Sequence, residues 1–199
     1  MTDDVFDGDP ARILLHPADY RHVGLVAADV VRLYGEGGPP FPILRLFALL
    51  QPFTRIESSP LTGREPVYGY SFALDFARHR KHAALFLDMS SPAPEVFITA
   101  FHEAGHILLH ILPPQYQTEV SHARLGGPGP RPGTQAEVEA DLFARLTTMP
   151  SAWVYAAWPY ACAATGTADE AIAWMAALFS VPWEWMRLRL ASLGLPADR

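Results

Sequence analysis

Apolar residues recur along most of the chain at the spacing of helix faces. Val23, Val26 and Val30 follow an interval of three to four residues, which predicts a helix over 17–34 that ends before Gly35. A shorter apolar segment predicts a second helix over 43–50. Similar patterns further along predict helices over 92–113, 134–148, 151–165 and 168–193, the last interrupted at Pro182.

Two segments have the composition of strands. Residues 67–77 and 83–89 are rich in aromatic and aliphatic side chains, and the polar segment 78–82 between them predicts a hairpin turn. Proline and glycine mark a loop over 58–66. The expected fold class is therefore α+β: a mainly helical domain with a small antiparallel sheet beside the helix over 92–113.

Length and composition indicate one domain. A chain of 199 residues, half of them hydrophobic, can bury one sizeable core, so we expect a single domain over 1–199. Residues 1–15 are expected to be peripheral or disordered. Residues 166–195 are expected to form a C-terminal helical part that resembles a helix-turn-helix.

Charge and cysteine usage exclude several classes of protein. The net charge of −6 argues against a general nucleic-acid or anionic-membrane binder. The acidic N-terminus does not fit a secretory signal, and no apolar run reaches the ~18 residues of a membrane helix. The single cysteine, Cys162, excludes an internal disulfide and fits a reducing compartment. We expect a cytoplasmic protein in which Cys162 lies in a buried helix.

The chemistry is concentrated at His102-Glu103-Ala104-Gly105-His106, an HExxH pattern. Two histidines four residues apart project from one face of a helix, so both imidazoles can bind one Zn²⁺ ion. Glu103 is rotated by about 100° from His102 and can contact a metal-bound water instead of the metal. An ordinary buried helix with two hydrogen-bonded histidines is the alternative. The metal site is favoured, because burying three polar side chains is unfavourable unless they form hydrogen bonds or bind a metal.

A catalytic zinc ion has three protein ligands, and the two histidines supply only two of them. A third histidine six residues after His106 would complete one known pattern, but Leu112 occupies that position. Glu137 is the preferred third ligand, because only it lies four residues before Asp141 on a shared helix face. Asp141 can then accept a hydrogen bond from a ligand histidine. Glu139 points away from the helix face that Glu137 and Asp141 share, and we expect it to lie on a solvated acidic face.

These segments resemble a known family. Residues 101–110 (FHEAGHILLH), followed by 137–144 (EVEADLFA) and Met149-Pro150, are similar to the ImmA/IrrE family of zinc metallopeptidases, and the similarity extends over roughly 67–195. Phe101 and Thr147-Thr148 depart from the family pattern without removing a ligand. The resemblance implies a gluzincin-like, zincin-type fold.

The resemblance also implies a function. Members are cytoplasmic proteases that cut a helix-turn-helix repressor and so release stress-response or mobile-element genes. For this chain that implies Zn²⁺ on His102, His106 and Glu137, with Glu103 as the catalytic general base. Three alternatives stay open: a module that sequesters a repressor without cutting it, a zinc hydrolase of small molecules, and a DNA-binding protein that uses 168–193.

The segment between the two candidate ligand helices, 113–134, is rich in proline and glycine. It can be read as a substrate-facing flap or as a plain linker. Tyr116 and His122 in this segment have the chemistry needed to stabilise a developing oxyanion, but the sequence assigns the role to neither.

Overall fold

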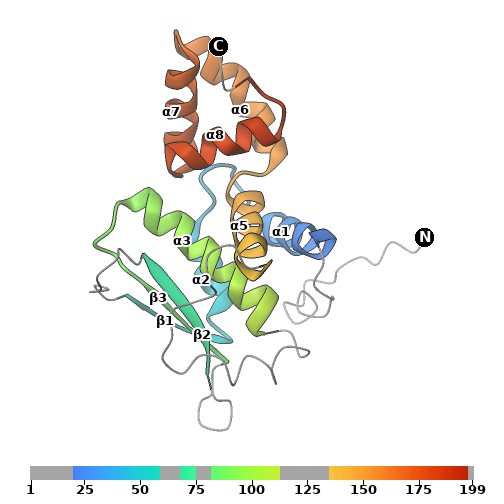
Figure 1. The fold of residues 1–199 in the computed structure, drawn as a ribbon, viewed down its shortest axis with the longest axis vertical. Coiled ribbons are helices and arrows are strands. Elements are labelled where there is room, and N and C mark those ends of the chain that lie inside the picture. Colours follow the sequence, from blue (N-terminus) through green and yellow to red (C-terminus); the bar gives the residue numbers. More distant parts are fainter. Residues whose placement is uncertain (1–19, 59–67, 75–81, 113–134, 197–199) are drawn as a thin grey trace, which may run out of the picture.

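The described part of the chain is mostly helical and contains one small sheet. The structure, a computed structural model, describes residues 20–58, 68–74, 82–112 and 135–196 (Figure 1). The α+β class predicted from the sequence is confirmed. Its helices are α1 (Tyr20–Tyr34), α2 (Ile43–Leu50), α3 (Ala93–His106), α5 (Gln135–Thr148), α6 (Ser151–Ala164), α7 (Ala168–Phe179) and α8 (Trp183–Ser192), and its strands are β1 (Thr54–Ser58), β2 (Gly69–Ala73) and β3 (Ala83–Leu87).

The sheet is mixed, which corrects the expectation of an antiparallel sheet. Its strand order is β1-β3-β2, and β2 pairs with β3 in antiparallel fashion, as the hairpin prediction required. The strand β1, however, pairs with β3 in parallel. The strand β1 was not predicted, because its segment TRIES contains one strongly apolar residue and begins a few residues after helix α2 ends.

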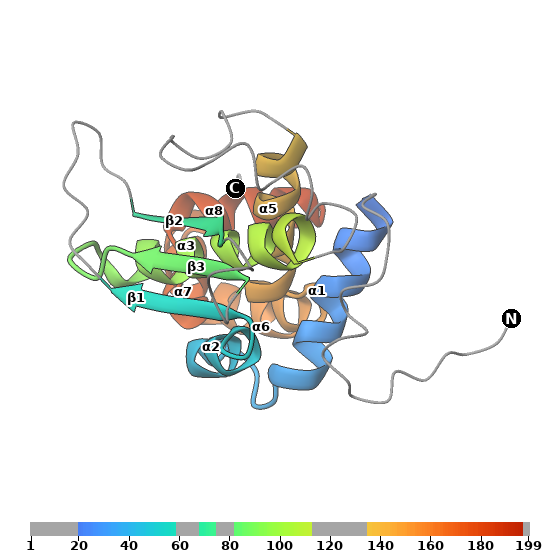
Figure 2. The ribbon, with the colours of Figure 1, turned by 90° about the horizontal axis from the view of Figure 1, so that it is seen from below.

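Burial explains why β3 is the central strand. Four of its five residues are buried and all are apolar, as is typical of a strand covered on both faces. Small residues bring β2 close to α3, since a Cβ atom on Gly69 would lie 2.7 Å from Cγ2 of Thr99. The helix α3 therefore lies directly against the sheet, with α5 along its other side (Figure 2).

The helix α3 continues into a π-helical turn, η2 (Ile107–Ile111), in which the Leu112 amide donates to the Ile107 carbonyl at 2.9 Å. The sequence predicted an uninterrupted helix to Pro113. Single π-helical turns within helices are frequent at functional sites. This turn carries His110, which lies beside the candidate site described below.

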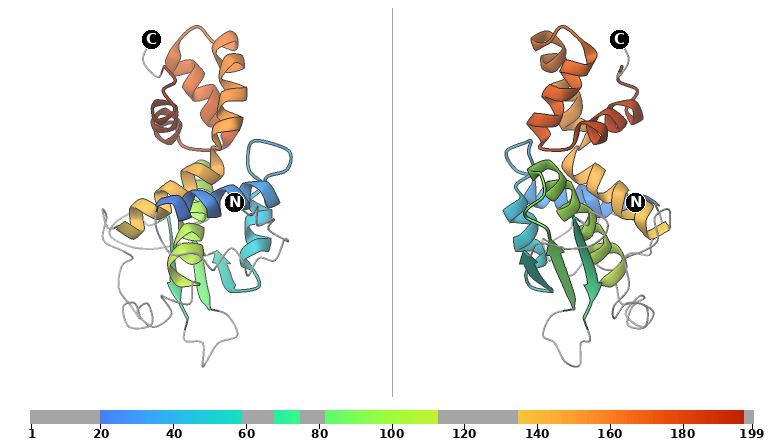
Figure 3. Two further views of the ribbon diagram at one scale, coloured as in Figure 1. Left: turned by 90° about the vertical axis from the view of Figure 1, so that its right-hand side faces the viewer. Right: turned by 60° about the vertical axis from the view of Figure 1, so that its left-hand side comes forward.

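The last three helices form a lobe at one end of the molecule (Figures 1 and 3). The predicted interruption at Pro182 is confirmed, because α7 ends at Phe179 and α8 begins at Trp183. The buried Arg189 on α8 holds the lobe to the end of α5, since its Nε donates to the Met149 carbonyl at 2.9 Å. The Arg145 guanidinium also lies 5.9 Å from the centre of the Trp185 ring.

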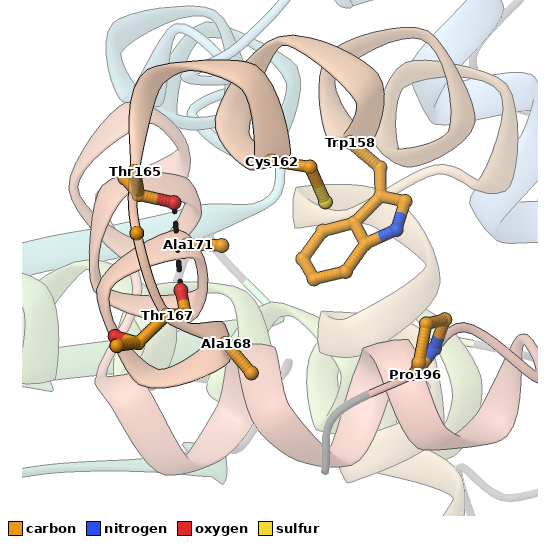
Figure 4. Close-up of a pocket in the computed structure, with 8 residues that line it drawn as sticks. Trp158, Cys162, Thr165, Thr167, Ala168, Ala171 and Pro196 are labelled. Carbon is orange, nitrogen blue, oxygen red and sulfur yellow. Dashed lines mark hydrogen bonds between the residues drawn. The ribbon is translucent and has the colours of Figure 1, made fainter. Parts of the chain in front are cut away.

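Cys162 is exposed, which corrects the expectation that it lies in a buried helix. It lines a cavity of about 360 Å³ together with Trp158, residues 165–168 at the start of α7, Ala171 and Pro196 (Figure 4). The helix α6 is apolar in sequence nearly all round, yet it belongs to a small lobe and buries only Val154, Trp158 and Ala161. Apolar composition therefore overstated its burial.

Candidate metal centre

Helix α3 supplies two of the three candidate ligands from one face. His102 and His106 are separated by one helical turn, and their Nε2 atoms lie 3.1 Å apart. His106 is buried, and the His102 side chain is 19% exposed. The apolar neighbours predicted from the sequence are buried around them, with Phe101 and Ala104 fully inside the core. Both imidazoles therefore point to the same place.

The third candidate ligand comes from α5. Glu137 places Oε2 at 3.2 Å from Nε2 of His102 and Oε1 at 3.4 Å from Nε2 of His106. His102, His106 and Glu137 thus form a group whose ligand atoms could hold a metal ion. The sequence-based choice of Glu137 over Glu139 agrees with this arrangement.

The spacing of the three donors fits a tetrahedral ion. Two ligands bound to one Zn²⁺ at about 2.0–2.1 Å lie about 3.3–3.4 Å from each other. The two Nε2 atoms lie 3.1 Å apart, Oε2 of Glu137 lies 3.2 Å from Nε2 of His102, and Oε1 lies 3.4 Å from Nε2 of His106, so each contact is near that length. One ligand atom from each of the three residues lies within 4.8 Å of the other two. A donor set of two imidazole nitrogens and one carboxylate also has the composition of a catalytic zinc site, which keeps a fourth position for water or substrate.

Close packing of α3 on α5 brings the carboxylate to the histidines. Gly105 lies between the two ligand histidines, and a Cβ atom there would meet Cα of Ala140 at 3.0 Å and Cδ1 of Phe143 at 3.2 Å. No larger residue fits this contact without moving α5. Gly105 therefore sets the distance between the two ligand-bearing helices.

Asp141 orients His102. Its Oδ1 lies 2.8 Å from Nδ1 of His102, the contact expected from the sequence. An ionised carboxylate accepts the Nδ1–H, which leaves the Nε2 lone pair for a metal. Burial by itself lowers the pKa of His102, but the Asp141 hydrogen bond and the charges of Glu103, Asp141 and Glu137 outweigh it, so the pKa is raised above 6.5.

The charge of Glu137 is stabilised by the same cluster. Its partial burial raises its pKa, but the hydrogen bond from His106 and the attraction of both histidines are stronger together, so the pKa is lowered below 4.5. Glu137 is therefore ionised near neutral pH, as a metal ligand has to be.

Glu139 is buried, so the expectation of a solvated acidic face is wrong for this residue. Its Oε2 lies 2.9 Å from Nε2 of His110, and its Oε1 accepts a hydrogen bond from the Gln135 side chain at 2.7 Å. Nδ1 of His110 in turn lies 3.2 Å from Nδ1 of His106. Burial, opposed by the Glu139 hydrogen bond, lowers the pKa of His110. His110 therefore belongs to the surroundings of the site and not to the ligands.

Glu103 lies beside the ligands and has a partner that the sequence did not reveal. The carboxylate is buried, and its Oε2 accepts a hydrogen bond from the Ser71 hydroxyl at 2.6 Å. Ser71 is on β2, where small residues alternate with Tyr70 and Phe72. This alternation was the available signal, because the face of small residues is the one that can approach a helix.

Some residues considered from the sequence lie outside the described part of the chain. They include the whole segment 113–134, and with it Tyr116 and His122. Among the described residues, none of the helices combines the length and the hydropathy that a membrane-spanning segment needs. Comparison of the sequence with models of protein families and with curated proteins finds no match.

Proposed function

We propose that this protein is a cytoplasmic zinc metallopeptidase that hydrolyses a peptide bond in a regulatory protein. The observation that carries the proposal is the convergence of His102, His106 and Glu137 on one point, with the carboxylate of Glu103 held beside them. The choice of a helix-turn-helix repressor as substrate follows from the ImmA/IrrE resemblance of segments 101–110 and 137–144.

The residues present fit the roles that the reaction needs. A bound Zn²⁺ ion would polarise the scissile carbonyl and lower the pKa of a coordinated water from 15.7 towards about 7. Glu103 would take the proton of the attacking water and deliver it to the leaving amine. Ser71 holds one oxygen of Glu103 through its hydroxyl, which leaves the other oxygen available for proton transfer.

The position of β2 favours a peptide over a small molecule as substrate. In the described sheet β2 pairs only with β3, so its other edge can accept an extended peptide through backbone hydrogen bonds. Ser71 lies on this strand and contacts Glu103, so a peptide added to β2 would pass beside the general base.

A regulatory module that binds a repressor without cutting it would need a folded binding surface but no catalytic residues. Nothing in such a module would require Glu103 to be buried beside two histidines and oriented by Ser71. Burying a carboxylate is unfavourable, so its retention supports catalysis.

A DNA-binding role for α7 and α8 has weaker support. Of the two arginines that the sequence offered there, Arg189 is buried and donates to the Met149 carbonyl, and Arg187 forms an ion pair with Glu184. Protein–DNA affinity depends on basic side chains that neutralise phosphates. These two arginines are already engaged within the protein.

The deciding experiment compares Glu103→Gln with His106→Ala. The purified protein, loaded with Zn²⁺, is incubated with candidate repressors, and mass spectrometry follows the new peptide ends. We expect Glu103→Gln to keep its zinc but lose cleavage, because glutamine cannot accept the proton, whereas His106→Ala loses both. Cleavage by Glu103→Gln at the wild-type rate, or full zinc content in His106→Ala, would contradict the proposal.

A further inference from the structure

A continuous chain of polar groups joins His106 to the first turns of α5. It runs from Nδ1 of His106 to Nδ1 of His110 at 3.2 Å, from Nε2 of His110 to Glu139 at 2.9 Å, and from Glu139 to the Gln135 amide at 2.7 Å. The side chains of His110 and Glu139 are 16% and 6% exposed. Little water can therefore compete for these contacts.

Metal binding through Nε2 of His106 selects one direction of hydrogen bonding along this chain. An ionised carboxylate has no proton to donate, so Glu139 must accept a hydrogen from Nε2 of His110. A neutral His110 then has a lone pair on Nδ1, which can accept the Nδ1–H of His106. With its proton on Nδ1, His106 has a free Nε2 lone pair, and Nε2 is the atom that faces Glu137 and His102.

We propose that His110 and Glu139 are positioning residues that hold His106 in the ring orientation and tautomer needed to bind the metal. Asp141 does the same for His102 through a single contact. The helix α5 would then supply one ligand, Glu137, and two carboxylates that orient the others: Asp141 acts directly on His102, and Glu139 acts on His106 through His110 of η2. This inference rests on the metal site of the proposed function, but it does not require peptide hydrolysis.

The main test compares two substitutions of His110. His110→Phe keeps a planar ring but removes the acceptor for His106, whereas His110→Asn places an amide oxygen, bonded to Cγ, where Nδ1 was. Zn²⁺ affinity is measured by competition with a chelator, and site geometry by the visible absorption of the Co²⁺-substituted protein. Loss of such orienting partners typically weakens metal binding 10–100-fold. We expect that loss and a changed Co²⁺ spectrum for His110→Phe, with recovery of most of the affinity in His110→Asn.

A double-mutant cycle tests whether His110 and Glu139 act in series. Glu139→Leu should weaken Zn²⁺ binding like His110→Phe, and the double variant should be no weaker than either single variant, because each breaks the same chain. Val154→Ala is the control for general destabilisation, since Val154 is fully buried in α6 within the C-terminal lobe and should leave Zn²⁺ affinity unchanged.

Wild-type affinity in His110→Phe, equal weakness of His110→Asn and His110→Phe, or multiplied losses in the double variant would each overturn the inference. None of these results would contradict the proposed function. The proposed function fails if the wild-type protein binds no zinc or cleaves no substrate.

Discussion

Gly105→Ala should weaken metal binding although it changes no ligand. The added Cβ would lie 3.0 Å from Cα of Ala140 on α5. Such a contact is tighter than carbon atoms normally make, so α5 would have to move by a few tenths of an ångström. The movement is forced on the backbone, because the atom contacted is not part of a flexible side chain.

That displacement exceeds what a metal site tolerates. Glu137 lies one turn before Ala140 on α5 and would move with it. Metal–ligand distances in proteins hold to within about 0.2 Å of their usual values. We therefore expect Zn²⁺ affinity to fall at least tenfold, which corresponds to about 1.4 kcal/mol.

The same substitution should change the stability of the metal-free protein only modestly. Overpacking a core destabilises by about 1–3 kcal/mol, while replacing glycine by alanine within a helix stabilises by about 1 kcal/mol. The net loss in free energy of unfolding should be about 0–2 kcal/mol. Thermal unfolding with and without Zn²⁺ separates the two effects, because Zn²⁺ at 100 times Kd stabilises by about 2.7 kcal/mol.

Gly24→Ala is the matched control. Gly24 also lies within a helix, α1, but apart from its chain neighbours and the nearby backbone of that helix no atom lies within 4 Å of the position its Cβ would take. It should gain about 0.5–1 kcal/mol of stability with unchanged Zn²⁺ affinity. Wild-type Zn²⁺ affinity in Gly105→Ala, or an equal loss of affinity in Gly24→Ala, would refute the packing argument.

Three further substitutions test single contacts. Asp141→Ala removes the acceptor for Nδ1 of His102 and should weaken Zn²⁺ binding 10–100-fold in a chelator competition, whereas an unchanged affinity would show that His102 needs no orienting group. Thr167→Ala removes the side-chain oxygen that caps α7 and should lower the free energy of unfolding in urea by about 1 kcal/mol without changing Zn²⁺ affinity. Ser180→Gly relieves a left-handed residue with φ of 56° and should raise the melting temperature; a lower melting temperature would mean that the serine side chain stabilises the end of α7.

Local spacing was sufficient for the parts of the site that lie within single helices. The four-residue interval puts His102 and His106 on one face because helix geometry is fixed by the backbone, and the same interval links Glu137 to Asp141. The positions of the helices and of the hairpin strands could be predicted in the same way, because each depends on a repeat of two or about 3.6 residues along the chain.

The amino-acid sequence by itself determined which side chains share a helix face, and the tertiary structure decided what that face meets. Glu139 was expected to be solvated, because helical spacing predicts the direction of a side chain around the helix axis but not which residues it contacts. In the structure α5 packs on α3, and Glu139 is buried against His110. Ser71 and the parallel strand β1 were missed for the same reason, because both depend on contacts between segments distant in sequence. The close approach at Gly105 is the tertiary contact that brings Glu137 to the two histidines.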